Sequence, residues 1–307
     1  MSHFLQSDAW KAFQQNLGRT VVVDQGKGWS YMAVLEPGTA NTRLYTPYGP
    51  TLETNALLPD ALASLKKAAT SYGATFVRIE PTLSISESVL GSLGLKPVNY
   101  QSLNPSRTQI VDLTCSKDEL LAQMSQNSRN LTRNYTNKGI SVTTSNDPSD
   151  IHYLTDLLSK VAHRNHIHAH SKSYFKTQAE TLFPLGAACL YLAHYDSQVI
   201  AAALVFDDAS TRYYAHAAAD DTYRKLSAGT ALVGQMILDA QENSQKYFDL
   251  YGIAPQNTPS HPWQGFTKFK QSFGGAPVDY SGSWDLPLKP LPYYGYRTYQ
   301  KLRHSLK

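Results

Sequence analysis

The segment from Tyr247 to Gly275, YFDLYGIAPQNTPSHPWQGFTKFKQSFGG, decides the fold of this chain of 307 residues. Its first residues form a short apolar pattern that predicts a buried strand, which Gly252 breaks. After a loop rich in Pro, Asn and Ser, aromatic residues at 266, 269 and 273 have the spacing of one helix face. Lys270 follows the second aromatic, so we expect its ammonium beside a buried stripe, where it could bind an anion or stabilise negative charge that develops in a reaction. A solvated lysine on an amphipathic helix is the alternative.

The composition is that of an ordinary globular protein, with 42% hydrophobic and 17% charged residues. Tyrosine is unusually frequent, at 20 residues, and offers ring faces and hydroxyls to polar ligands. The formal net charge of +4 fits a polyanionic partner without demonstrating one. The two cysteines match no metal spacing and weakly indicate a reducing compartment. No signal-peptide pattern or transmembrane window is found, so we expect a cytoplasmic protein.

The first third of the chain alternates helix and strand patterns. A helix is predicted at 4–17, a hairpin at 21–35, a helix at 57–72 and a strand at 74–79. This order suits an acetyltransferase-like α/β unit with a central mixed sheet.

The pattern restarts at Thr108. A strand is followed by a helix with a capping box at Ser116 and Glu119. Farther along this helical region, Arg129 and Arg133 are four residues apart, so they share a helix face and can form a joint anion site; solvated surface charge is the alternative. Segments 189–194, 199–206 and 212–217, separated by turn residues, predict an antiparallel meander.

A histidine-rich segment lies between these elements. His163, His166 and His170 have a spacing that suggests a metal site. No cysteine or carboxylate spacing nearby supports one, so we expect no bound metal.

Taken together, these motifs resemble the FemABX family of peptidoglycan interpeptide-bridge aminoacyltransferases. The family's signature near the end of the chain is matched by Phe248, Asp249, Gly252, Ile253, Gly265, Phe269, Lys270, Phe273 and Gly274. Earlier motifs match in the family's order at Gln6, Ser7 and Trp10; at Tyr45, Pro47, Gly49 and Pro50; at Arg78, Glu80 and Pro81; at Asp112, Leu113, Arg129, Arg133, Lys138, Gly139 and Ile140; and at Arg164, Ile167, His170, Ser171, Tyr174 and Phe175.

The resemblance implies an α/β (α+β) fold of two tandem GNAT-like domains, that is, domains similar to acyl-coenzyme A N-acyltransferases. The long coiled-coil arm of some members has no room in this sequence. We expect a first domain at 1–107, completed by a C-terminal helix at 293–307, and a second domain at 108–286.

The resemblance also implies the functional residues. Lys270 matches the family lysine that is thought to assist acyl transfer, and Tyr214 matches its catalytic-site tyrosine. The implied substrate-binding residues are Arg129, Arg164, His170, Tyr174, Tyr45, Glu80 and Lys11. Two positions depart from the family pattern. Gln14 stands where bridge-forming members often carry a substrate-binding lysine, with Lys11 nearby, and His170 stands where some members have arginine.

The implied reaction moves an amino acid from aminoacyl-tRNA to an amine on the stem peptide of a peptidoglycan precursor, either UDP-linked or lipid-linked. The ester is already activated, so the protein must juxtapose the reactants, remove a proton from the amine and stabilise the oxyanion. No cofactor is expected. We expect a monomer, and peripheral contact with a membrane is compatible with this function.

Two other functions stay open. A coenzyme A-dependent N-acetyltransferase normally needs an R/Q-x-x-G-x-G/A loop that holds pyrophosphate at a helix N-terminus. The nearest segment, 224–231, has Ser227 at the first glycine position, which disfavours that function. A family member that binds tRNA or precursor without turnover is the third reading, and Gln14 and His170 are the residues that support it.

Overall fold

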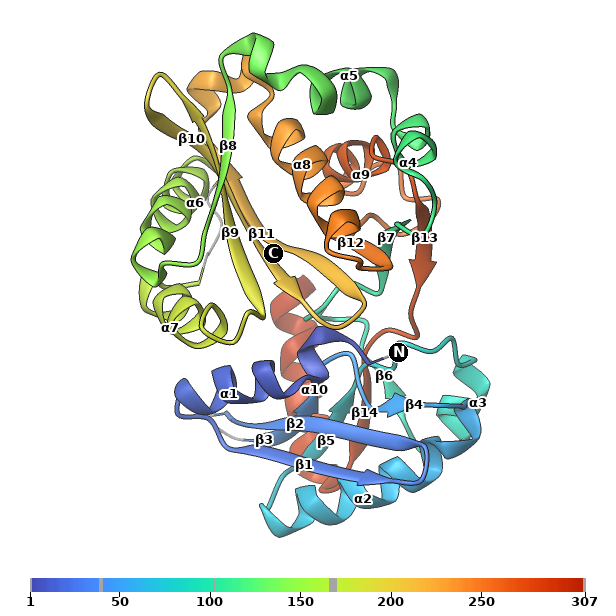
Figure 1. The fold of residues 1–307 in the computed structure, drawn as a ribbon. Helices are drawn as coiled ribbons and strands as arrows, with labels where there is room; N and C mark the ends of the chain where they lie inside the picture. Colours follow the sequence, from blue (N-terminus) through green and yellow to red (C-terminus); the bar gives the residue numbers. More distant parts are fainter. Residues whose placement is uncertain (1, 39–40, 102, 166–169, 306–307) are drawn as a thin grey trace. The chain divides into compact units, whose positions relative to one another are not determined.

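The chain forms two compact units in the computed structural model, which describes residues 2–38, 41–101, 103–165 and 170–305 (Figure 1). The first unit comprises Met1–Ser106 and Asp279–Lys307, and the second comprises Arg107–Val278. The first unit is therefore assembled from both ends of the sequence.

The end predicted for the second domain, at residue 286, is wrong. β14 (Trp284–Pro287) pairs antiparallel with β5 (Phe76–Ile79), so this segment belongs to the sheet of the first unit. A strand of four residues carries no local sign of its partner, because the partner is set by contacts that are distant in sequence.

A mixed sheet is the framework of the first unit, with the strand order β1-β2-β3-β5-β14-β6 and with β4 paired to β2. β3 and β5 run parallel, whereas the other pairs are antiparallel. This arrangement confirms the sheet type that the sequence predicts. The remaining strands are β1 (Val21–Gly26), β2 (Trp29–Pro37), β3 (Thr42–Thr46), β4 (Thr51–Leu52) and β6 (Lys96–Pro97).

Helices pack on this sheet through apolar stripes. α2 (Leu58–Ser71) buries Leu58, Leu62 and Leu65, which share one helix face, in a core with sheet residues such as Val77. α1 (Asp8–Asn16) begins where the Ser7 side chain accepts a hydrogen bond from the Trp10 amide, which is an N-cap. The other helical segments of this unit are η1 (Phe4–Gln6), η2 (Asn55–Leu57), α3 (Glu87–Ser92) and α10 (Pro290–Ser305).

An ion pair with no exposure to solvent joins β5 to β14. Arg78 and Asp285 are both 0% exposed. The Arg78 Nε and Nη2 atoms donate to the two carboxylate oxygens of Asp285 at 2.7 and 3.0 Å. Tyr100 and Gln101 accept further hydrogen bonds from the guanidinium. The bidentate geometry and the extra partners satisfy two charges that would otherwise be costly to bury.

The second unit contains a sheet with the strand order β13-β7-β12-β11-β10-β9-β8. β9, β10 and β11 form the antiparallel meander that the sequence predicts, with bounds wider by one or two residues. β11 and β12 are parallel, and β12 is antiparallel to β7. The strands are β7 (Arg107–Asp112), β8 (Ser141–Ser145), β9 (Ala188–Tyr195), β10 (Gln198–Asp207), β11 (Thr211–Ala219), β12 (Tyr247–Gly252) and β13 (Ala276–Asp279).

Helices lie on both faces of this second sheet, as Figure 1 shows. On one face, Ala201, Ala203 and Val205 of β10 pack into a core with α8 (Ala228–Glu242). On the other face, α6 (Ile151–Asn165) contacts β10 and β11 and packs against α7 (Lys172–Leu182). The other helical segments are α4 (Lys117–Gln123), α5 (Gln126–Asn134), η3 (Tyr135–Lys138), η4 (Pro148–Asp150), η5 (Asp221–Leu226) and α9 (Gln264–Gln271).

Within the described residues, no helix is both long enough and apolar enough to cross a membrane.

Replacing Asp285 with Ala should strongly destabilise the protein. The substitution leaves the Arg78 guanidinium buried without its counter-charge, which typically costs about 3–5 kcal/mol in the free energy of unfolding. Glu242→Gln removes the exposed Lys117–Glu242 pair (3.3 Å) and should cost less than about 1 kcal/mol. Urea unfolding followed by tryptophan fluorescence compares the two variants. Equal losses in the free energy of unfolding would show that the buried ion pair stabilises the protein no more than the exposed pair does.

Candidate functional site

The sheet of the second unit opens at the ends of two neighbouring strands. β11 and β12 are paired in parallel at three positions, the last of which joins Tyr213 to Asp249. Beyond that pair, β12 also interrupts its register with β7, between Asp249 and Gly252. Ligands of α/β sheets commonly bind outside the carboxyl ends of parallel strands. The residues that follow the last pair therefore define a candidate site.

The backbone of β12 bends at Tyr251, whose φ of 62° lies in the left-handed region. The Asp249 carboxylate accepts hydrogen bonds from the Tyr251 amide, at 2.7 Å, and from the Thr108 hydroxyl. Asp249 itself is buried, at 2% exposure. A bulky residue in this conformation costs about 1–3 kcal/mol, and such residues cluster at functional sites. The carboxylate thus fixes a strained bend at the opening of the sheet.

Lys270 lies against this bend. Its Nζ donates a hydrogen bond to the Gly252 carbonyl oxygen at 2.7 Å. Burial lowers the pKa of Lys270 to about 8, although the Asp249 carboxylate opposes the change. Burial also raises the pKa of Asp249 to about 6, against the opposing effects of Thr108, Tyr251 and Lys270. Two groups whose pKa values are both moved toward neutrality mark a candidate site for proton transfer or charge stabilisation.

The aromatic stripe predicted for this helix is wrong at one position. Phe266 is 63% exposed, whereas Phe273 is fully buried and Phe269 partly so. Thr267 is buried instead, because its hydroxyl accepts a hydrogen bond from the Ala254 amide at 2.8 Å and donates one to the Trp263 carbonyl. These bonds turn the Thr267 face of α9 toward the loop that follows β12. A polar anchor at Thr267 therefore holds α9, the helix that carries Lys270, against this loop.

The two glycines after α9 allow the chain to pass close to β7. Gly275 has a φ of +74°, and a side chain there would collide with the backbone carbonyl of Ile110. Gln109 donates a hydrogen bond to the Gly274 carbonyl oxygen at 2.8 Å. Only glycine fits such a close approach at a positive φ. The FGG sequence is thus a structural requirement for seating α9.

Tyr214 is half-buried and packs against the core on the α8 face of the sheet. Burial raises the pKa of its phenol, so the hydroxyl stays protonated at neutral pH. This hydroxyl makes no hydrogen bond to a described residue, whereas the Tyr213 hydroxyl donates to Asp208 at 2.8 Å. The two tyrosines thus have different environments, as strand alternation predicts, and Tyr214 retains a donor for a ligand. No hydrogen bond or ion pair within the described chain joins Tyr214 to Lys270.

His170 and Tyr174 come together at the start of α7. Their rings stack with centroids 4.0 Å apart and an interplanar angle of 13°. His216 of β11 lies edge-on to His170, with a centroid distance of 6.3 Å. Burial and the neighbouring His170 lower the pKa of His216 to about 4, so His216 is neutral at pH 7. Sequence reasoning missed His216; a lone polar ring within an apolar strand is the signal that could have found it.

The arginines proposed to bind substrate lie on different parts of the second unit. Arg164 at the end of α6 forms an exposed ion pair with Asp221, at 3.2 Å. Arg129 on α5 donates to the Ala122 carbonyl oxygen at 3.4 Å. α5 packs against α8, whereas α6 packs against the sheet face that α8 does not cover. The structure does not bring these two guanidinium groups together within the second unit.

Tyr45 and Glu80 lie in a closed network of the first unit. The Tyr45 hydroxyl donates to Glu80 Oε2 at 2.6 Å, and Asn104 donates to the same oxygen at 2.7 Å. Ser283 donates to Glu80 Oε1 at 2.5 Å. Burial, reinforced by Glu80, raises the pKa of Tyr45 well above its usual range. Both side chains are buried in this network, so their role in the structure is to hold the loop region together. Nothing in the structure supports direct contact of either side chain with a substrate.

The Gln14 departure from the family pattern has a structural explanation. Gln14 is buried, and its Oε1 accepts a hydrogen bond from Arg19 Nη1 at 2.8 Å. Lys11, the nearby lysine, is partly exposed and lies 3.9 Å from the Asp8 carboxylate. Gln6, in contrast, clamps the loop after β3 by donating to the Pro47 carbonyl and accepting from the Met32 amide.

No group of three or more His, Cys, Asp or Glu side chains could hold a metal ion in the part of the chain that the structure describes. His166 and the motif residue Ile167 lie outside the described residues.

Comparisons with known proteins identify a matching family and several solved structures with a similar fold. The sequence matches the FemAB family over residues 1–198 and 190–301. The crystal structure of FemX has a TM-score of 0.84 and 17% identity, over 97% of this chain and 94% of that one. L-PGS from Bacillus licheniformis has a TM-score of 0.58 and 12% identity, over 98% of each chain. A comparison with curated proteins found no match.

A further match concerns the architecture. A tandem GNAT protein from the clavulanic acid biosynthesis pathway has a TM-score of 0.52 and 13% identity, over 87% of this chain and 82% of that one. At such identities the likeness shows the fold alone. The chain has the tandem GNAT-like architecture that the sequence predicted.

Titration of Lys270 should be visible directly. The ¹³Cε resonances of labelled lysines should include one with a midpoint near pH 8, and Lys270→Met should remove it. The folded-state pKa lies below the ordinary value of 10.5, so the unfolded chain binds more protons between pH 8 and 10.5. The free energy of unfolding of the wild type, relative to Lys270→Met, should therefore rise with pH across that window. A Lys270 midpoint near pH 10 would contradict the burial argument.

Proposed function

Because this chain belongs to the FemAB family, we propose that it transfers an amino acid from an aminoacyl-tRNA to an amine on a peptidoglycan precursor. The family match, which extends across nearly the whole chain, is the observation that carries the proposal. Members of this family are aminoacyltransferases. The reaction would take place in the cytoplasm and require no cofactor. The acceptor would be a UDP-linked or lipid-linked stem peptide.

The chemistry needs no covalent intermediate on the protein. The acceptor amine attacks the ester carbonyl of the aminoacyl-tRNA, and a bond forms between nitrogen and carbon. The resulting oxyanion collapses, the bond to the ribose oxygen breaks, and the amine loses a proton while the ribose oxygen gains one. A protein accelerates such a step by holding the reactants together and by stabilising charge that exists only in the transition state.

Lys270 is suited to that second task. With a pKa of about 8, it is mostly protonated at pH 7 yet gives up a proton more readily than an exposed lysine. We assign its ammonium to stabilise the oxyanion or the departing ribose oxygen. The hydrogen bond to the Gly252 carbonyl keeps the ammonium at the opening of the sheet. Tyr214 is assigned a hydrogen bond from its neutral hydroxyl to the same reacting group.

Substrate anchoring is assigned to further side chains that the family resemblance implies. The stacked rings of His170 and Tyr174 provide a preorganised surface. Arg129 and Arg164 supply positive charge for anionic groups of tRNA or precursor, and Lys11 does so on the first unit. Tyr45 and Glu80 act indirectly, by holding the loop that contains Pro47 and Gly49.

Acetyl coenzyme A is the alternative donor, and the loop before α8 bears on whether this protein could bind it. In the loop before α8, Ser227 has a φ of 57° and provides no side-chain cap to the helix. A serine adds bulk where close backbone approach to a pyrophosphate calls for glycine. This feature counts against an acetyltransferase that uses coenzyme A.

The donor test compares two substrates directly. The protein is incubated with mixed aminoacyl-tRNAs or with acetyl coenzyme A, together with precursor pools, and the muropeptides are analysed by mass. Aminoacyl-tRNA should support transfer, and donor binding should weaken steeply as salt rises, because tRNA phosphates release counterions on binding. Transfer from acetyl coenzyme A with none from aminoacyl-tRNA would refute the proposal. Tight binding of tRNA and precursor without product would favour the non-catalytic alternative.

Two lysine variants test the assignment of the site. Lys270→Met keeps the aliphatic bulk but removes the charge, and should lower turnover about a hundredfold or more, the usual loss for one such electrostatic contact. Lys268→Met changes an exposed lysine two positions away and should retain near wild-type turnover. Melting temperatures of both variants control for folding. A fully active Lys270→Met, or an equally impaired Lys268→Met, would place the site elsewhere.

A further inference from the structure

The outer face of α10 is apolar. Four large side chains of this helix are exposed: Leu291 (90%), Tyr294 (50%), Tyr299 (60%) and Leu302 (61%). Exposed residues of this size are ordinary where they are scattered singly over a surface, whereas a concentration of them marks an interaction site. Four on one helix of 16 residues are such a concentration.

These four side chains lie on one side of the helix. At about 100° per residue, they fall within about 140° of its circumference. Tyr293 projects to the opposite side, where it is fully buried and its ring centroid lies 5.4 Å from that of Phe76. Tyr296 stacks on the same Phe76 ring at 5.3 Å. One face of α10 is thus packed on the first unit, and a second apolar face is turned outward.

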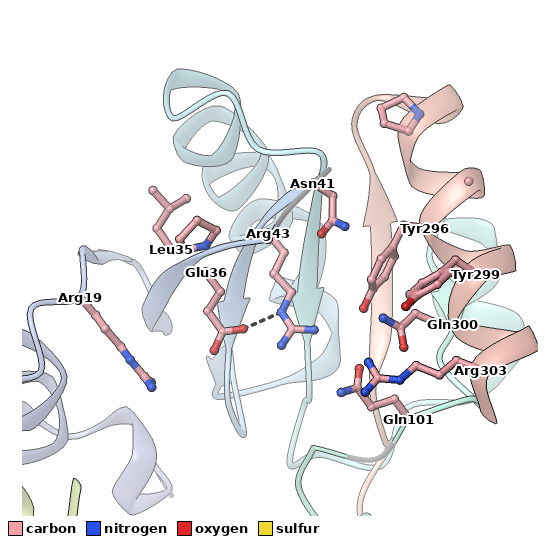
Figure 2. A pocket seen from close by; sticks show the side chains of 14 residues that line it. Arg19, Leu35, Glu36, Asn41, Arg43, Gln101, Tyr296, Tyr299, Gln300 and Arg303 are labelled. Atoms are coloured by element: carbon pink, nitrogen blue, oxygen red, sulfur yellow. Dashed lines mark hydrogen bonds and ion pairs between the residues drawn. The ribbon is translucent and has the colours of Figure 1, made fainter. Parts of the chain in front are cut away.

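A pocket of 1010 Å³ separates the C-terminal half of α10 from the ends of β2 and β3 (Figure 2). Tyr299 and Arg303 line it from the helix, whereas Leu35 and Arg43 line it from the strands. This half of the helix therefore stands off from the sheet. Its outward side chains remain accessible to a large partner.

Positive charge surrounds the apolar face. Residues 286–307 contain five lysine or arginine residues and no aspartate or glutamate, although the net charge of the whole chain is only +4. Lys301 and Arg303 are exposed and flank Leu302 in the sequence, so they project about 100° to either side of it. Their aliphatic stems allow the charged ends to reach away from an apolar layer. The surface is apolar at its centre and cationic at its edges.

A lipid surface with anionic headgroups fits this pattern. Leucines of an amphipathic helix enter the boundary of the acyl chains, tyrosines favour the headgroup level, and lysines and arginines meet the anionic headgroups. A second copy of the chain fits less well, because two such helices carry like charge and repel each other. A nucleic acid would engage the cations and leave the leucines in water.

We propose that α10 docks this protein on anionic membranes. The helix lies in the plane of the headgroups, with Leu291 and Leu302 inserted and with Lys301 and Arg303 near lipid phosphates. The proposal does not rest on the transferase function, because none of these residues is assigned to the acyl-transfer step.

Co-sedimentation of the full chain with lipid vesicles tests the proposal, without any precursor or tRNA. The vesicles contain phosphatidylcholine alone or an equal mixture of phosphatidylcholine and phosphatidylglycerol. The mixed vesicles should bind the protein, and added salt should weaken the binding. Leu302→Ser should weaken it about tenfold, because the variant loses an apolar side chain that is buried on docking. Lys301→Gln and Arg303→Gln should each weaken it about fivefold.

Leu185→Ser is the matched control for the leucine. Leu185 is 58% exposed, close to the value for Leu302, but it lies in the second unit between α7 and β9. Lys246→Gln removes one exposed positive charge from the second unit and is the control for the cations. Both variants should bind like the wild type. All of the substituted side chains are exposed, so the variants should fold, and melting temperatures check this.

Three results would overturn the proposal. The first is the absence of binding to mixed vesicles at millimolar lipid, or equal binding to vesicles of phosphatidylcholine alone. The second is an equal effect of Leu302→Ser and Leu185→Ser. The third is a dimer, seen by analytical ultracentrifugation, that Leu302→Ser dissociates, because a second copy would then cover this face. Transfer assays on the Lys270 and Lys268 variants report separately on the catalytic proposal.

Discussion

The first unit depends on one ion pair, between Arg78 and Asp285, which lie 207 positions apart in the sequence. Neither side chain reaches solvent, so each charge is compensated only by the other and by the polar groups around them. The pair also organises its neighbours. Two residues after Arg78, Glu80 accepts a hydrogen bond from Ser283, two residues before Asp285. Tyr293 donates to Asp285 and accepts from Arg297, which ties α10 to the same centre.

Much of the fold could be predicted because its signals are local. Strand alternation and turn residues define the β9–β11 meander, and a serine cap defines the start of α1. The placement of β14 could not be predicted in this way. Nothing within residues 284–287 shows that Asp285 needs Arg78, because the ion pair exists only after the sheet has formed. The error at Phe266 has a similar cause, since a hydrogen bond from the distant loop amide of Ala254 decides which face of α9 is buried.

The sequence motif proposes Lys270 as a site residue, but it does not predict the environment of that side chain. The motif favours Lys270 over Lys268 as the candidate, and in the structure Lys270 is half-buried whereas Lys268 is exposed. Its contact with the Gly252 carbonyl requires the bend at Tyr251, which a sequence pattern does not encode. Asp249 belongs to the same motif, yet its electrostatic coupling to Lys270 emerges only from shared burial. Gln14, which departs from the family pattern, is part of the packed structure because it accepts a hydrogen bond from Arg19.

The discontinuity of the first unit has a consequence for synthesis of the chain on the ribosome. Domains usually fold in the order in which they emerge, from the N-terminus onward. Here the second unit is encoded without interruption by residues 107–278, whereas the sheet of the first unit lacks an internal strand until β14 has been made. The nascent chain must therefore hold an incomplete sheet, with the Arg78 guanidinium still without its carboxylate, while the later-encoded unit folds. The unit that begins the sequence is the last to reach its native state.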